Sequence, residues 1–209
     1  YLDQARSIGP GSIVARRASR NNPERARGLN ENLAREIMEL HTLGVRSGYS
    51  QEDVTELARA LTGWSVGGLP GLPAGGTPGA FVFQPLLHEP GARSVLGKGY
   101  ERSGEAQASA ILHDLAVAPA TARHIAATLA RHFAGDTPAP ALVDRLADAF
   151  MQSRGDLPTV YRALIDSPEA WNPAQSKFKT PWEWTLSSLR ALSLHELRGL
   201  LTIDDAMIE

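Results

Sequence analysis

The sequence contains no cysteine, and this absence excludes several kinds of chemistry. Without thiols the chain forms no disulfide bond, offers no thiolate nucleophile and builds no zinc or iron–sulfur site on cysteine. A chain without cysteine is compatible with any redox compartment, so its composition leaves the localisation open.

Long hydrophobic runs and a large net charge are missing as well. No stretch approaches the roughly 18 consecutive apolar residues of a membrane-spanning helix, so we expect a soluble chain without a membrane span. The formal net charge of -2 gives no global reason to expect a nucleic acid or an anionic membrane as partner. Hydrophobic residues make up 43% of the 209 positions, which is enough for one ordinary core or two small ones.

The first 28 residues predict an irregular lead-in followed by a basic linker. Glycine and proline at 9–11 interrupt regular structure, and Arg16–Arg27 holds five arginines against a single acid. A basic arm that binds phosphates is the alternative. No aromatic side chain is interleaved for base stacking, however, and Asn-Asn-Pro at 21–23 breaks a helix. We therefore expect residues 29–209 to form the helical domain.

The clearest helix is predicted over Asn30–Thr42. Asn30 is a good N-cap residue, and Gly44 is typical of the position after a helix end. At 100° per residue, His41 falls inside the apolar arc of this helix and Glu36 falls at its edge. The apolar stripe itself consists of Leu33, Ile37 and Leu40.

Helical spacing, caps and turn residues predict the rest of the architecture. Six further helices are expected at about 50–62, 104–117, 119–133, 140–151, 156–165 and 180–194. Phe133 and Ile165 fall on the inward apolar faces of two of them. Seven glycines and three prolines between Gly63 and Gly79 predict a long loop, either functional or disordered.

One small β-hairpin completes the predicted fold. The segments 81–83 and 94–96 flank a turn and favour extended structure. The sequence thus predicts a mainly α fold, a single multi-helix orthogonal bundle with one small hairpin.

Several runs of residues carry a family pattern. They read GLNENLAREIMELHTLG at 28–44, GY at 48–49, EDV at 52–54 and LARALTGW at 57–64, with further matches at 1–3, 88–97, 119–122 and 178–183. This pattern resembles the bacterial family called domain of unknown function 1800 (DUF1800) along nearly the whole chain. Two positions depart from the family pattern, since Glu89 replaces a usual aspartate and Thr128 a common lysine.

The resemblance implies a family membership rather than an activity. Such proteins are similar to exported bacterial proteins, and the chain would be a fragment with further regions before Tyr1 and after Glu209. Their genes often neighbour those of a second, sulfatase-like family, which makes the product of a neighbouring gene a candidate partner. The resemblance indicates neither a reaction nor a cofactor, so both stay unknown at this point.

Two short motifs resemble known functional patterns in sequence, but their structural context or spacing does not fit. Residues 63–67 match G-x-S-x-G, but a helix precedes them and a glycine-rich loop follows, whereas a nucleophile elbow joins a strand to a helix. Residues 91–98 miss the phosphate-loop spacing by one residue, and Gly99 stands where a magnesium-binding hydroxyl is needed. Neither motif therefore predicts catalysis or nucleotide binding.

Glu36, His41 and His88 are the candidate catalytic residues. Glu36 and His41 lie about 140° apart on one helix, and His88 sits in a turn that could fold over it. A buried carboxylate near imidazoles could act as acid, base or metal ligand. In the alternative, Glu36 pairs with an arginine or a helix end and His41 is a satisfied core histidine. No histidine spacing predicts a metal site on its own.

Lys177, Lys179 and Thr180 form a candidate anion site. Two ammonium groups precede a helix N-terminus whose free N–H groups attract negative charge. The alternative is an ordinary structural loop.

Two functions from different classes remain. The first is an interaction or scaffold module of an exported bacterial protein, which recognises a partner through helix faces and the glycine-rich loop. The second is part of a hydrolase or a metal-dependent enzyme whose site is completed by regions outside this chain. The absence of a complete catalytic set favours the first.

Overall fold

The computed structural model describes residues 1–21, 28–71, 75–173 and 177–194, and this part of the chain is mainly α. Its helices are α1 (Ile13–Asn21), α2 (Asn32–Glu36), α3 (Gln51–Leu61), α4 (Glu105–Ala116), α5 (Pro119–Phe133), α6 (Pro140–Gln152), α7 (Leu157–Ile165) and α8 (Pro181–Ala191). Its strands are β1 (Trp64–Val66), β2 (Phe81–Phe83), β3 (Arg93–Val95) and β4 (Lys98–Tyr100). None of the described helices is long and apolar enough to cross a membrane.

Local capping interactions begin the helices where the sequence predicts. Ser50 and Asp53 form a reciprocal capping box at the start of α3, and Thr180 and Glu183 form another at α8. Asp156 accepts a hydrogen bond from the Thr159 N–H at 3.0 Å and so caps α7. These contacts span three residues, which is why the sequence alone predicts them.

The predicted helix over Asn30–Thr42 is not one continuous α-helix. After α2 the chain forms a π-helical turn, η3 (Ile37–His41), and the Gly44 N–H closes it by donating to the Met38 carbonyl at 3.0 Å. A π turn takes in an extra residue, so later side chains point in new directions. As a result Met38 is fully buried, whereas Leu40 and His41 are exposed, which corrects the prediction that both face the core.

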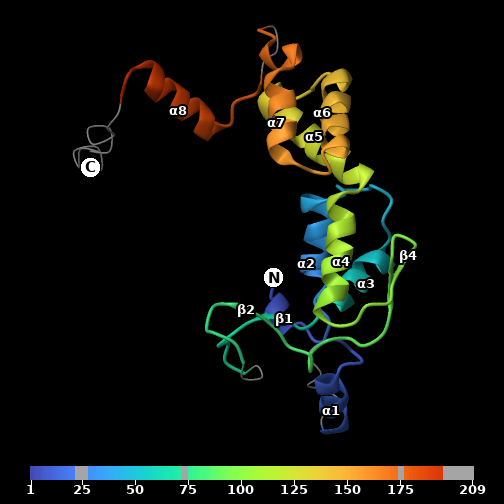
Figure 1. Cartoon of the computed structure of the whole chain (residues 1–209). Helices are drawn as coiled ribbons and strands as arrows, with labels where there is room; N and C mark the ends of the chain where they lie inside the picture. Colours follow the sequence, from blue (N-terminus) through green and yellow to red (C-terminus); the bar gives the residue numbers. More distant parts are fainter. Residues whose placement is uncertain (22–27, 72–74, 174–176, 195–209) are drawn as a thin grey trace, which may run out of the picture.

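The apolar side chains are buried in two main clusters rather than one. The first joins α2, η3, α3 and α4 with strand β3. The second joins α5, α6 and α7, helices that lie beyond the C-terminal end of α4 (Figure 1). The expectation of a single orthogonal bundle is therefore not confirmed.

The first 28 residues, which we expected to form an irregular lead-in and a basic linker, contain helix α1. Ser12 caps this helix by accepting a hydrogen bond from the Ala15 N–H at 3.2 Å. The helix packs on a distant part of the chain, in a small cluster that contains Ile8, Ala15 and Leu87. That contact is not visible in a local sequence pattern. Residues 22–27 of the expected basic linker lie outside the described residues.

The strands form two separate two-stranded antiparallel sheets. β1 pairs with β2, and β3 pairs with β4, so the predicted pairing of 81–83 with 94–96 is wrong. Leu96 and Gly97 both have positive φ, 52° and 74°, and turn the chain tightly from β3 back to β4. Because of this turn, β4 is nearer to β3 along the chain than β2 is, and β3 pairs with β4. Residues 72–74 of the expected glycine-rich loop lie outside the described residues.

Candidate functional site

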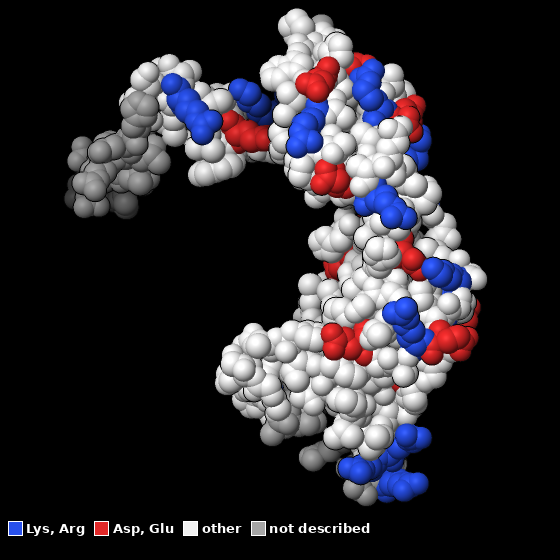
Figure 2. All heavy atoms as spheres, viewed as in Figure 1, with Lys and Arg blue, Asp and Glu red and all other residues white. Residues whose placement is uncertain are grey.

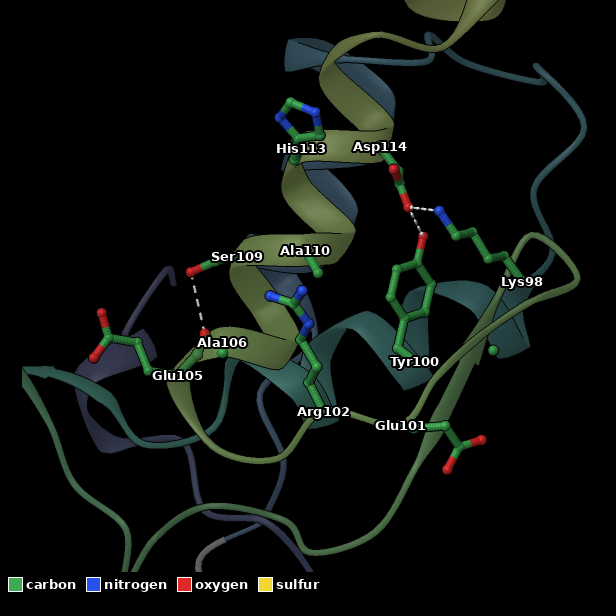
Figure 3. Close-up of a pocket in the computed structure, with 11 residues that line it drawn as sticks. Lys98, Tyr100, Glu101, Arg102, Glu105, Ala106, Ser109, Ala110, His113 and Asp114 are labelled. Atoms are coloured by element: carbon green, nitrogen blue, oxygen red, sulfur yellow. Dashed lines mark hydrogen bonds and ion pairs between the residues drawn. The ribbon is translucent and has the colours of Figure 1, made fainter.

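Two grooves and one cluster of hydrogen bonds stand out among the described residues. The larger of the two has a volume of about 890 Å³, is lined mainly by polar and charged residue types and runs along the first three turns of α4 beside β4 (Figure 3). We call it the polar groove. Its side chains include Lys98, Tyr100, Arg102, Ser109, His113 and Asp114.

One end of the polar groove is held by a hydrogen-bonded charge cluster. The Tyr100 hydroxyl donates to Asp114 at 2.7 Å, and the Lys98 ammonium donates to the same oxygen at 2.5 Å. The hydrogen bonds from Lys98 and Tyr100 lower the pKa of Asp114. Burial, together with the bond to Asp114, raises the pKa of Tyr100. At neutral pH the carboxylate is charged and the phenol is protonated, so this cluster fixes β4 against α4.

The other side chains of the polar groove are less constrained. Arg102 extends along the face of α4 toward Ser109 and Ala110, and His113 lies one turn further along the helix (Figure 3). Ser109 donates to the Glu105 carbonyl at 3.1 Å. The described residues of this groove thus provide hydrogen-bond donors but no nucleophile with an adjacent base.

Glu36 lies next to Tyr1, the N-terminal residue. Its carboxylate accepts a hydrogen bond from the Tyr1 hydroxyl at 3.1 Å, while the amides of Asn30 and Asn32 both donate to the Tyr1 carbonyl. His41 is exposed at the end of η3. Glu36 therefore helps to hold the start of the chain on α2.

His88 lies in a different set of contacts. Its Nδ1 is 2.8 Å from the Thr62 carbonyl oxygen, and its Nε2 accepts from the Gly104 N–H at 3.2 Å. The next residue, Glu89, accepts from the Gly11 N–H at 2.6 Å and donates its own N–H to the Thr62 hydroxyl. His88 and Glu89 thus join the ends of α3 and β2 to the start of α4 and to the segment before α1.

The three candidate catalytic residues share no hydrogen bond among the described contacts, and their site stays a prediction. Glu36 contacts the N-terminus, His41 is exposed, and His88 contacts the C-terminal end of α3. Within the described ranges, no group of three histidine, aspartate or glutamate side chains is arranged to hold a metal ion.

The candidate anion site is filled by contacts within the chain. Lys177 donates to the His132 carbonyl at 2.6 Å, and Lys179 donates to Ser187 at 2.9 Å. The Glu183 carboxylate accepts from the Thr180 N–H at 2.9 Å, so a negative group already occupies the N-terminus of α8. Anion binding at this place stays a prediction.

An apolar groove of about 520 Å³ lies between α5, α7 and the short 3-10 helix η4 (Pro168–Trp171). Its lining residues include Leu129, Phe133, Tyr161, Leu164, Ile165 and Trp171. Phe133 and Ile165, which we expected to face inward, are 60% and 58% exposed. Each is the last residue of its helix. That terminal position is the signal by which the sequence could have indicated this groove.

The wall of the apolar groove is held in place by specific contacts. The indole N–H of Trp171 donates to the Ile165 carbonyl at 2.6 Å, which ties η4 to the end of α7. Arg145 on α6 makes two hydrogen bonds to Glu169, at 2.7 and 3.1 Å, and a third to Ser167. These contacts position η4 before any ligand binds.

Charges of both signs are interspersed over the α5–α7 part of the face in Figure 2, where no extended patch of one sign is seen. Blue groups gather instead on α1, which carries Arg16, Arg17 and Arg20. The side chains that line the apolar groove carry no formal charge, so its lining offers no electrostatic attraction to a highly charged partner.

The chain was matched by one family model, described as "Protein of unknown function (DUF1800)", over residues 1–207. No curated protein and no solved structure matches it. Because the match spans all but two of the 209 residues, the chain belongs to the DUF1800 family, to which no function is assigned.

Proposed function

We propose that this chain is an interaction module whose apolar groove binds a helical segment rich in large apolar side chains. The observation that carries the proposal is the groove between α5, α7 and η4, with Phe133 and Ile165 exposed on it. Grouped exposed apolar side chains of this kind mark protein-binding surfaces, and a groove between helices suits an amphipathic helix.

Two features of the groove support the proposal that it binds a partner and is not simply an incompletely covered part of the hydrophobic core. Arg145 and Trp171 hold its wall in place, so little conformational entropy is lost when a partner binds. The exposed residues are mostly aromatic, and aromatic side chains contribute strongly at the centres of interfaces. A partner encoded by a neighbouring gene, which the family resemblance suggests, stays a prediction.

Selection from a library of displayed peptides tests this function. We expect the selected peptides to carry Trp, Phe or Leu at positions i, i+4 and i+7. Ile165→Asp should weaken their binding at least tenfold, about 1.4 kcal/mol, because it places an unpaired carboxylate in the groove. Val45→Asp is the matched control, since Val45 is 62% exposed and lies outside the groove.

Two results would contradict the proposal. One is a selection against the monomeric chain that enriches no peptide over the starting library. The other is a set of peptides that bind the Ile165→Asp variant as tightly as the original chain.

The enzymatic alternative, with Glu36, His41 and His88 as catalytic residues, stays a prediction. No contact among the described residues favours it over the interaction module, since each of the three lies in a different environment.

A further inference from the structure

We propose that the helical segment bound by the apolar groove is α8 of a second copy of this chain, exchanged reciprocally between the two copies. This inference rests on the proposed function and names the segment that the groove binds. We use the term C-terminal arm for residues 177–194, which contain α8.

Within the described part of the chain, helix α8 buries none of its residues. Figure 1 shows it projecting away from the α5–α7 unit. It has 11 residues, and isolated helices shorter than about 12–15 residues are marginal in water. A helix of this length is stabilised mainly by packing of its apolar face, which here requires a surface outside the arm.

The apolar face of α8 has the spacing of a groove-binding helix. Trp182, Leu186 and Leu189 follow one another at i, i+4 and i+7 and therefore share a face. Trp182 is 70% exposed. Trp184, two positions further, points to the opposite side and does not belong to this face.

The start of the arm is attached in a way that directs α8 outward. Lys177 donates to the His132 carbonyl, and the Phe178 N–H donates to Asp136 at 2.9 Å, just after the end of α5. From this anchor α8 extends away from the body (Figure 1). The residues that line the groove include none from the arm. The groove of each copy is open while its own α8 is positioned to reach another copy.

The area of the contact fits a stable dimer. Phe178 and Trp182 of the arm and Phe133 and Trp171 of the groove are 60–77% exposed. At about 150 Å² for each large aromatic side chain, one contact covers roughly 600 Å² and the two contacts of an exchange roughly 1,200 Å². The leucines of α8, Tyr161 and Ile165 add to this sum. Stable interfaces bury about 1,200–2,000 Å² in total.

Reciprocal exchange also explains why both surfaces exist in one chain. Each copy provides one helix and one groove, so two copies satisfy all four surfaces and the assembly closes with two-fold symmetry. The charges are balanced as well, because α7 carries Arg162 and is followed by Asp166, while α8 carries Glu183 and Arg190.

Sedimentation equilibrium of the 209-residue chain and its variants tests the exchange. We expect a dimer whose dissociation constant rises more than tenfold in Trp182→Ser and in Ile165→Asp. Trp184→Ser and Val45→Asp are the matched controls and should leave it unchanged, since Trp184 is also exposed, at 63%, but faces away. Circular dichroism of each variant checks that the helices remain folded.

Mixing the two disrupted variants distinguishes a dimer formed by exchange of α8 from dimers formed in other ways. The Trp182→Ser chain keeps its groove and the Ile165→Asp chain keeps its helix, so their mixture should form a heterodimer through one intact contact. Pairing of two α8 helices is excluded if Ile165→Asp weakens the dimer, and packing of two grooves is excluded if Trp182→Ser weakens it. A dimer that survives both substitutions would overturn the proposal.

If the chain is a monomer in solution, a second copy is not the partner of the groove. The proposed function of the groove is not refuted by that result alone. If the monomer still binds the displayed peptides and loses them in Ile165→Asp, the proposed function holds and only the exchange is refuted. If Trp182→Ser then increases peptide binding by the monomer, the occupant is the arm of the same chain. If no peptide binds, the proposed function fails as well.

Discussion

At the scale of single residues, His88 shows how one side chain connects distant segments. A carbonyl oxygen can only accept, so Nδ1 donates to Thr62 and Nε2 accepts from Gly104, which selects the neutral Nδ1–H tautomer. The ring also packs edge-on against Phe83, with centroids 5.3 Å apart. All polar atoms of the imidazole are therefore used within the fold.

We expect His88→Ala to lower the free energy of unfolding by about 2–3 kcal/mol, because it leaves the Thr62 carbonyl and the Gly104 N–H without this partner. Urea denaturation measures the change. His41→Ala is the control and should change stability by less than about 0.5 kcal/mol, since His41 is exposed. An unchanged stability in His88→Ala, together with loss of a stoichiometric metal ion, would instead favour the enzymatic alternative.

At the scale of elements, the short helix η4 depends on a charged contact with α6. The hydrogen bonds from Arg145 lower the pKa of Glu169 relative to its ordinary value of 4.5. The folded state thus prefers the carboxylate form. Its contribution is complete above the unfolded pKa and is lost as the pH falls through the lower, folded pKa.

We therefore expect η4 to loosen as the pH falls through the lowered pKa of Glu169, where the carboxylate takes up a proton and the bonds from Arg145 are lost. Exchange of the Trp171 indole proton, which is hydrogen-bonded to Ile165, measures this loosening by NMR. Glu169→Gln should show fast exchange already at neutral pH, whereas Glu105→Gln, on α4, should not. An indole proton equally protected in Glu169→Gln would rule out this role of the ion pair.

The elements also differ in how far the sequence predicts them. The boundaries of α3 and α8 follow from capping boxes, which are contacts between residues three apart. The π turn η3 does not follow from periodicity, because an α-helical pattern counts 100° for every residue and a π turn changes that count. Leu40 and His41 were misplaced for this reason.

At the scale of the whole molecule, two hydrophobic clusters share few contacts. Between them, Thr121 donates to the Leu115 carbonyl at 2.6 Å, and His124 Nε2 is 3.0 Å from the Leu40 carbonyl oxygen. Each cluster has its own fully buried leucines, such as Leu57 in the first and Leu146 in the second. Such an arrangement favours local unfolding of one part at a time.

We expect Leu146→Ala to cost about 2–5 kcal/mol and to increase hydrogen exchange mainly in α5–α7, because it opens a cavity in the second cluster alone. Leu57→Ala should increase exchange mainly in α2–α4. Hydrogen exchange followed by mass spectrometry compares the two variants. Equal increases in both clusters after either substitution would show one cooperative unit.

The sequence could not indicate the surroundings of the candidate catalytic residues, for the same physical reason. Glu36 and His88 are both engaged in hydrogen bonds, but their partners, Tyr1, Thr62 and Gly104, lie far away in the chain. No local pattern contains those partners. The apolar groove was missed because the pattern of α5 and α7 shows which side chains are apolar and not how far a neighbouring helix covers them.

The sequence by itself determined what depends on composition and on neighbours along the chain. These properties are the absence of thiol chemistry, the mainly α fold, the family and the starts of the capped helices. Only the tertiary structure decided the pairing of the four strands, the division into two clusters and the exposure of Phe133 and Ile165. These depend on contacts between segments distant in sequence, whose free energy comes from packing and is not encoded in any short window.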